Sequence, residues 1–222
     1  LCEEVIGLKA DNPYAYHMLG LVREDDGHWD EAVPQFRRAI ELHPTYVEAR
    51  NHLGRCLTRQ GEIDAAIDVL RKAIDLKPEY AGPHENLGVA LGLKLQFVEA
   101  IEELRKAIDL DPNSAQAHTD LGAVLVRQGQ LSAGIEEHQR AIQLNPDHAQ
   151  AHNNLGNAFK FQNELDSAIS EYHEAIRLNS RLAAPRFNLA QTLMDREVLE
   201  SLQTMPGAPP VIPARPSAVE TS

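Results

Sequence analysis

Apolar residues recur along this chain with the period of a helix that buries one face. Between residues 47 and 60, Leu53, Cys56 and Leu57 fall three and four positions apart, which places them on one side of an α-helix. Ile67 and Leu70 open a second stretch with the same kind of spacing. The pattern therefore predicts two amphipathic helices in succession.

Residues with particular backbone preferences mark the ends of these two helices. Gly61 is expected to end the first, because glycine adopts the left-handed cap conformation at little cost. Asp64 is expected to cap the start of the second. Lys77 is expected to end it, since the residue before a proline is disfavoured in helical backbone angles. The unit is thus helix, tight turn and helix.

The same unit returns at a fixed interval of 34 residues. The residues that return in phase are Gly20, Gly54, Gly88, Gly122 and Gly156; Pro44, Pro78, Pro112 and Pro146; and the Ala-Ile pairs that begin at Ala39, Ala73, Ala107, Ala141 and Ala175. Such a period is typical of stacked arrays, in which each repeat buries its apolar face against its neighbours. We expect the glycine row to let paired helices approach closely, and the alanine row, with Gly134, to receive it.

The residues at fixed places in each unit resemble the tetratricopeptide repeat (TPR). One copy carries Leu53-Gly54, Ala66, Leu70, Ala73 and Pro78, and the next carries Leu87-Gly88, Ala100, Leu104, Ala107 and Pro112. This order of small, bulky and terminal proline residues in a helix pair is typical of that family. The resemblance implies an all-α fold, namely a right-handed α-solenoid of helix-turn-helix repeats.

The period divides the chain into five expected repeats, at 13–46, 47–80, 81–114, 115–148 and 149–182. Residues 1–12 are expected to be the end of a truncated preceding repeat, and 183–203 a partial repeat or C-terminal capping helix. The proline-rich residues 204–222 are expected to form a disordered tail. Because residue 1 is Leu, we expect the chain to be a fragment. The fourth repeat, with Gly134 and His138 in place of Ala and a bulky apolar residue, is expected to be the loosest.

Charge and hydropathy narrow the classes of partner. The 222 residues include 33 Asp and Glu against 21 Lys and Arg, a net charge of −12. Electrostatics therefore oppose the approach of nucleic acid or an anionic membrane surface. No apolar run reaches the ~18 residues of a membrane-spanning helix, and no secretion signal opens the chain. We predict a cytoplasmic protein whose partner is a protein or peptide, not nucleic acid or a membrane.

No set of residues indicates catalysis, a cofactor or a metal. The chain has no phosphate loop, nucleophile motif or metal-binding helix motif, so we predict that it is not an enzyme and binds no cofactor. His84, His118 and His152 occur once per repeat, roughly 10 Å apart at usual helix-packing distances, and so cannot share one ion. We interpret them as structural or surface residues. The pairs Glu102-Glu103 and Glu136-Glu137 are expected to be solvated on the convex face.

The TPR resemblance implies that the first helices of successive repeats line a concave groove. The position two before each repeated glycine holds Met18, His52, Asn86, Asp120, Asn154 and Asn188. Asparagine both donates and accepts hydrogen bonds, so this row resembles the asparagine ladder by which some TPR arms hold an extended peptide. Asparagine is also common on solvated helix faces, which is the alternative. The expected peptide-binding residues are His52, Arg55, Asn86, Asp120, Asn153, Asn154, Asn157 and Asn188.

Three hypotheses of function remain open. The first is a protein–protein interaction scaffold that binds an extended peptide or partner protein in the groove. The alternative is a substrate-recruiting TPR arm of a larger enzyme, similar to O-linked N-acetylglucosaminyltransferases. The third is self-association through the uncapped N-terminal end, whose apolar edge could stack on another copy.

Overall fold

A computed structural model describes residues 12–203 of the chain. Within them there are eleven α-helices and no β-strand. The helices are α2 (Pro13–Asp25), α3 (Trp29–Leu42), α4 (Val47–Gln60), α5 (Ile63–Leu76), α6 (Ala81–Leu93), α7 (Phe97–Leu110), α8 (Ala115–Gln128), α9 (Leu131–Leu144), α10 (Ala149–Phe161), α11 (Leu165–Leu178) and α12 (Ala183–Gln203). The predicted truncated repeat at 1–12, except its last residue, and the predicted tail at 204–222 lie outside the described residues.

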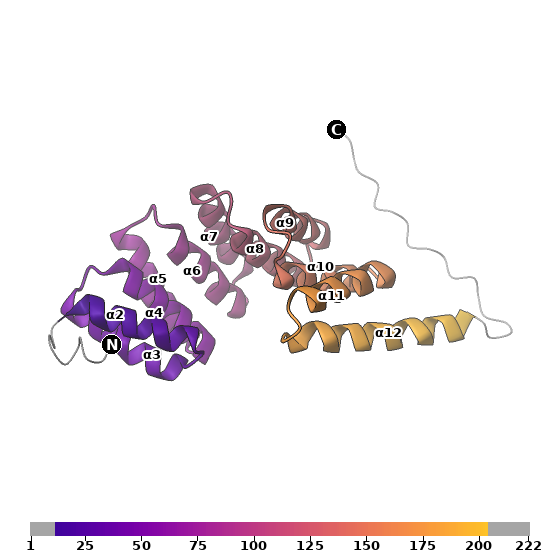
Figure 1. The fold of residues 1–222 in the computed structure, drawn as a ribbon. Helices are drawn as coiled ribbons and strands as arrows, with labels where there is room; N and C mark the ends of the chain where they lie inside the picture. Colours follow the sequence, from indigo (N-terminus) through magenta and orange to yellow (C-terminus); the bar gives the residue numbers. More distant parts are fainter. Residues whose placement is uncertain (1–11, 204–222) are drawn as a thin grey trace, which may run out of the picture.

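The helices pack in pairs, and the pairs stack into a curved array with the long α12 at one end (Figure 1). α2 packs on α3, α4 on α5, and so on to α10 on α11. The first helices of neighbouring pairs also contact one another, since α4 contacts both α2 and α6, and α8 contacts both α6 and α10. The predicted all-α fold, a right-handed α-solenoid, is confirmed.

One bulky side chain per pair fills the space between its two helices. The members of this row are Phe36, Leu70, Leu104, His138 and Tyr172, and each is fully or almost fully buried. Each lies against the repeated glycine of the first helix. A Cβ atom added to Gly88 would lie 2.5 Å from Leu104 Cγ and 3.0 Å from the Ala100 carbonyl oxygen. The glycine row is therefore needed for the close approach of the helices.

The side chain that meets each glycine is not the alanine that we expected. In an α-helix the Cα–Cβ bonds tilt toward the helix N-terminus, so a bulky residue reaches back over the preceding turn. Leu104 thus covers the space beside Ala100 and meets Gly88. Ala100 itself contributes its backbone oxygen, because its small side chain lets the backbones come together. The small-residue row therefore meets the glycine row through its backbone, as at Gly88 with Ala100 and at Gly122 with Gly134, while the side chains that meet the glycines are those of the bulky row.

The turn inside each pair places one residue in the left-handed backbone region. Gly27, Gly61 and Gly129 have φ of 77°, 82° and 92°, and Leu95 and Asn163 take the same conformation with φ of 65° and 62°. These five positions share the 34-residue period. A non-glycine side chain in this region costs roughly 1–2 kcal/mol. Packing of the repeats therefore overrides the local preference of Leu95.

The helix cap predicted at Asp64 is wrong. α5 begins at Ile63, and its N-cap is Glu62, whose side chain makes no capping hydrogen bond. Asp64 lies in the first turn and instead pairs with Lys94, whose Nζ is 2.7 Å from Asp64 Oδ1. The packing of the next pair therefore decides the role of this carboxylate.

His138 is the polar member of the bulky row. Its side chain lies against Gly122, and neither ring nitrogen has a hydrogen-bond partner among the described residues. Burial lowers the pKa of His138 to about 4. A buried polar group without a partner carries a desolvation penalty, so this pair contains a destabilising residue where Leu70 and Leu104 stand in other pairs. The expectation that this repeat is the loosest stays a prediction.

Replacing Gly88 by alanine is expected to destabilise the array. The added methyl group would overlap Leu104 and the Ala100 carbonyl, and overfilling a packed core costs about 1–3 kcal/mol. Urea denaturation followed by circular dichroism should show that loss in the free energy of unfolding. Gly82→Ala is the matched control in the same helix, because its nearest neighbouring atom would be 3.2 Å away. Equal losses in the two variants would contradict the proposed role of the glycine row.

Replacing His138 by leucine is expected to raise the free energy of unfolding by about 1–3 kcal/mol at pH 7, because it removes a buried polar group without a partner. The folded pKa lies below the unfolded value near 6.5, so the folded state binds this proton more weakly. The free energy of unfolding of the parent chain therefore decreases as the pH falls from 6.5 toward about 4.

The same denaturation series, measured between pH 7 and pH 4, tests this account of His138. The leucine variant should lose less stability over that range than the parent chain. His173→Leu makes the same chemical change at an exposed position of α11 and should leave both quantities nearly unchanged. A stability profile that does not differ between the parent and His138→Leu would rule out the buried ring as its cause.

Candidate functional site

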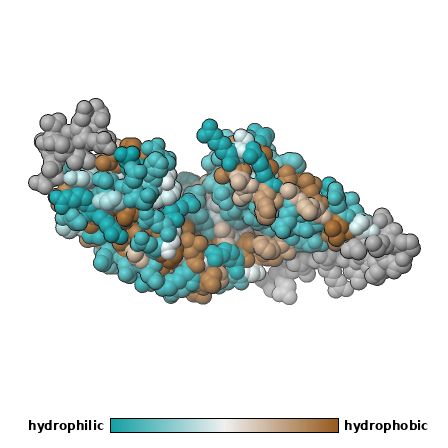
Figure 2. All heavy atoms as spheres, turned by 90° about the horizontal axis from the view of Figure 1, so that it is seen from below, coloured by the Kyte–Doolittle hydropathy of each residue, from teal (hydrophilic) through white to brown (hydrophobic). Residues whose placement is uncertain are grey.

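Four first helices in succession, α4, α6, α8 and α10, line a groove with a volume of about 950 Å³. Five of the eight predicted binding residues line it, namely His52, Arg55, Asn86, Asp120 and Asn154. Its other lining residues include Arg59, Tyr80, Glu85, Gln116 and Gln150. The face of the molecule seen in Figure 2 is mostly hydrophilic, with scattered hydrophobic patches, and is hollowed near its middle. We refer to the space lined by α4, α6, α8 and α10 as the groove.

The other three predicted residues form a hydrogen-bonded cluster between α10 and α12. The Asn188 amide donates to Asn153 Oδ1 at 3.0 Å and to Asn157 Oδ1 at 2.9 Å. Asn157 Oδ1 also accepts from the Tyr172 hydroxyl at 2.9 Å, and Asn153 is buried. These amides are therefore engaged in holding neighbouring helices together, and none of the three lines the groove.

The contact between Asn188 and Asn153 has a counterpart earlier in the chain. Asn86 donates from its side-chain nitrogen to Asn51 Oδ1 at 2.8 Å. In both contacts the partners are 35 positions apart, so they occupy the same two places at different junctions between pairs. Sequence reasoning missed these contacts, although asparagines one repeat plus one residue apart were a visible signal.

Two carboxylates occupy the same places at the junction of α6 and α8. Glu85 stands where Asn51 and Asn153 stand, and Asp120 stands where Asn86 and Asn188 stand. The Asp120 oxygens both accept from the Gln116 side-chain nitrogen at 3.1 Å, and Glu85 accepts from the Ser114 hydroxyl at 3.4 Å. We call Glu85 and Asp120 the carboxylate pair.

The groove raises the pKa values of both members of this pair. The surrounding protein displaces water from the inner wall, and this desolvation, with the charge of Glu85 added, raises the pKa of Asp120 to about 7. Desolvation also raises the pKa of Glu85, against a hydrogen bond from Ser114 and the charge of Arg55. The groove therefore holds two carboxyl groups whose charged forms are disfavoured.

Glu24 of α2 contacts two basic residues, His52 and Arg55, at the α4 end of the groove. Its side chain is almost fully buried, and its oxygens lie 2.8 Å from His52 Nδ1 and 2.6 Å from Arg55 Nε. Burial raises the pKa of Glu24, but the hydrogen bonds from His52 and Arg55 outweigh this effect and lower the pKa to about 2. The carboxylate therefore fixes two of the predicted groove residues in place. Glu24 was not among the predicted groove residues.

The three periodic histidines each pair with a glutamate of the following helix. His84, His118 and His152 lie 2.6 Å from Glu103, Glu137 and Glu171, and each glutamate is 19 positions further along the chain. The expectation that Glu103 and Glu137 are solvated is wrong, because both side chains are partly covered and face the first helix of their pair. These histidines are structural contacts within pairs.

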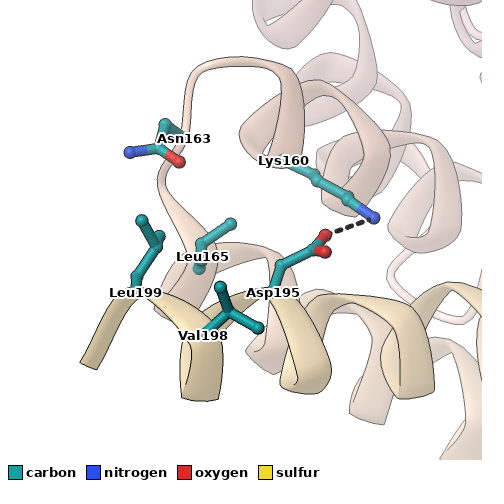
Figure 3. A pocket seen from close by; sticks show the side chains of 6 residues that line it. All are labelled: Lys160, Asn163, Leu165, Asp195, Val198 and Leu199. Atoms are coloured by element: carbon teal, nitrogen blue, oxygen red, sulfur yellow. Dashed lines mark ion pairs between the residues drawn. The ribbon is translucent and has the colours of Figure 1, made fainter. Parts of the chain in front are cut away.

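A smaller cavity of about 320 Å³ lies between α12 and the turn that joins α10 to α11. Lys160 points to Asp195 across it, with 3.0 Å between Nζ and Oδ2, and Leu165, Val198 and Leu199 supply apolar walls (Figure 3). This ion pair joins α12 to α10. The volume of this cavity is about a third of the volume of the groove.

Neither a membrane span nor a metal centre is found in the part of the chain that the structure describes. No helix between residues 12 and 203 has the length and apolarity to cross a bilayer. Over the same residues, no group of three or more His, Cys, Asp or Glu side chains is placed to hold a metal ion.

Models of one protein family match most of the chain. A tetratricopeptide repeat model matches residues 17–81, a TPR repeat model matches 96–129 and 124–162, and a further tetratricopeptide repeat model matches 149–181. The chain belongs to the tetratricopeptide repeat family. The resemblance seen in the sequence is thereby confirmed, and the groove lies along the first helices of successive TPR units.

Solved structures of other TPR proteins share the fold of this TPR array. A thermophilic TPR protein of Thermus thermophilus has a TM-score of 0.75 and 23% identity, over 82% of this chain and 99% of that one. A chain of the APC/C hetero-tetramer Cut9-Hcn1 has a TM-score of 0.81 and 19% identity, over 88% of this chain and 39% of that one. YrrB, described as a TPR protein with an unusual peptide-binding site, has a TM-score of 0.58 and 19% identity, over 88% and 97%. No curated protein sequence matches this chain.

Replacing Glu24 by glutamine is expected to destabilise the first two TPR units by about 1–3 kcal/mol, because two charged hydrogen bonds to a buried carboxylate are lost. The folded pKa near 2 lies below the ordinary value of 4.5. The stability that Glu24 contributes is therefore complete above pH 4.5 and is lost as the pH falls toward 2.

Urea denaturation at pH 7 and at pH 3 checks this role of Glu24. The difference in the free energy of unfolding between the parent chain and Glu24→Gln should be smaller at pH 3 than at pH 7. The exposed Glu79→Gln change is the matched control and should have little effect at either pH. If both variants behave as the parent does at pH 7, the contacts of Glu24 do not stabilise the array.

Proposed function

We propose that this TPR array is a protein–protein interaction scaffold that binds an extended polypeptide in the groove. The observation that carries the proposal is one continuous groove of about 950 Å³ along α4, α6, α8 and α10. Its walls present side-chain amides, two arginines and the carboxylate pair. These are groups that bind a polypeptide by hydrogen bonds and charge, and no nucleophile stands beside a base among the lining residues.

The amide side chains suit the backbone of an extended peptide. Gln116, Gln150 and Asn154 follow one another on α8 and α10, and Gln150 donates to Asn154 Oδ1 at 2.8 Å. An amide side chain carries both donors and an acceptor, so it matches the alternating N–H and C=O groups of a peptide. Such contacts tolerate many peptide sequences, because the peptide backbone is the same in all of them.

The groove residues and the supporting residues have separate roles in this proposal. Asn86, Asp120 and Asn154 contact the peptide, and His52 and Arg55 contact it at the end held by Glu24. Asn153, Asn157 and Asn188 support the helices, since their amides bond to one another. A cytoplasmic location, self-association through the N-terminal end and a role as the arm of a larger enzyme stay predictions.

Binding to an array of short peptides tests the proposal. The triple variant Asn86→Ala, Asp120→Ala and Asn154→Ala should weaken the strongest parent interactions by at least about tenfold, since each lost hydrogen bond contributes about 0.5–1.5 kcal/mol. The matched control replaces the exposed Asn113, Gln130 and Gln143 by alanine and should bind as the parent does. Equal binding by all three proteins, or no binding by the parent, would contradict the proposal.

A further inference from the structure

The junction of α6 and α8 differs chemically from the junction of α4 with α6 and from that of α10 with α12. At each of those two junctions an amide N–H of one asparagine donates to the side-chain oxygen of another, at 2.8 Å and 3.0 Å. The carboxylate pair occupies these same two places. Ionised carboxylates are acceptors only, so Glu85 and Asp120 cannot make the bond that the asparagines make.

The charges around the pair leave it short of a positive partner. From α4, Arg55 is paired with Glu24 at 2.6 Å and acts on Glu85 only through its charge. Arg59 likewise acts on Asp120 only through its charge. From α10, the groove-lining Gln150 and Asn154 are uncharged. The bonds that Asp120 and Glu85 do make come from neutral groups, the Gln116 amide and the Ser114 hydroxyl.

The pair also opens into space that a ligand can enter. Both residues line the groove, midway between the arginines of α4 and the amides of α10. Desolvation is the main cause of the raised pKa values of both carboxyl groups, and the charge of Glu85 adds to it at Asp120, so the nearby arginine charges do not fully compensate for the lost water. A cationic group entering the groove would supply both the missing donors and the missing charge.

We infer that the polypeptide bound in the groove places the side chain of an arginine or lysine against Glu85 and Asp120. This inference rests on the proposed function and adds the chemical character of the ligand. The cation forms charge-assisted hydrogen bonds with the two carboxylates, while the amides of α8 and α10 hold the backbone beside it. The net charge of −12 favours the approach of such a basic segment.

Two short capped peptides test the inference on the full chain. One alternates alanine and serine around a central arginine. The second peptide is identical except that citrulline replaces the central arginine. Citrulline keeps the shape of arginine without its charge. Fluorescence polarisation at fixed salt should show the arginine peptide binding about tenfold more tightly, the factor that corresponds to about 1.4 kcal/mol.

The double variant Glu85→Gln and Asp120→Asn should abolish this preference. It recreates the kind of amide pair found between α4 and α6 and between α10 and α12, so the fold should be retained. The melting temperature measured by circular dichroism should not fall below that of the parent. The matched control, Glu102→Gln and Asp109→Asn, makes the same change of charge at exposed positions of α7 and should keep the preference.

The dependence on pH supplies an independent readout, since arginine itself stays charged. Binding a cation favours the ionised form of Asp120, whose pKa lies at about 7. The affinity for the arginine peptide should therefore rise between pH 6 and pH 8, and this rise should be absent in Asp120→Asn. The charged groups that act on Asp120 are Glu85 of α6 and Arg59 of α4, and the other charged or titratable residues that line the groove are Arg55 and His52 of α4.

The outcomes separate this inference from the proposed function. Equal binding of the two peptides, or a preference that survives the double variant, would overturn the inference and leave peptide binding in place. Failure of both peptides to bind would overturn both. Saturable binding of calcium to the chain alone, lost in the double variant, would assign the carboxylate pair to a metal ion and overturn the inference.

Discussion

The contact between a glycine of the first helix and a bulky side chain of the second sets the spacing within each TPR unit. A methyl group on Gly88 would overlap Leu104, and the same holds for Gly156 and Tyr172. Because every pair has this spacing, the same outer surface recurs every 34 residues, and each pair can pack on the next one. The groove exists because five such contacts keep the first helices in register along the array.

Polar side chains add hydrogen bonds within and between the units, beside the small apolar core. Histidine and glutamate pair within units, asparagines pair between units, and Glu24 joins the first unit to the second through His52 and Arg55. Each buried polar group in these contacts has a partner, so burial adds specificity without a large desolvation penalty. The repeat period thus applies to hydrogen bonds as well as to apolar packing.

The same framework tolerates residues that suit their positions poorly. Leu95 takes a left-handed backbone conformation that glycine adopts in other units, and His138 is buried without a hydrogen-bond partner. In both cases the neighbouring units impose the geometry, and the local cost is spread over an array with many other contacts. The carboxylate pair is a third departure, but it opens into the groove, where a ligand can compensate for it.

The sequence by itself determined the helix pairs, their period and the family. These follow from the spacing of apolar and small residues, which is a local property of the chain. It also predicted five residues that line the groove, four of which occupy the position two before the repeated glycine. The partners of polar side chains were decided only in the tertiary structure. Asn154 and Asn188 look alike in the repeat, yet Asn154 lines the groove and accepts from Gln150, whereas Asn188 donates to Asn153 and Asn157 of α10. The partners differ because they come from side chains that only the packing of the helices brings together.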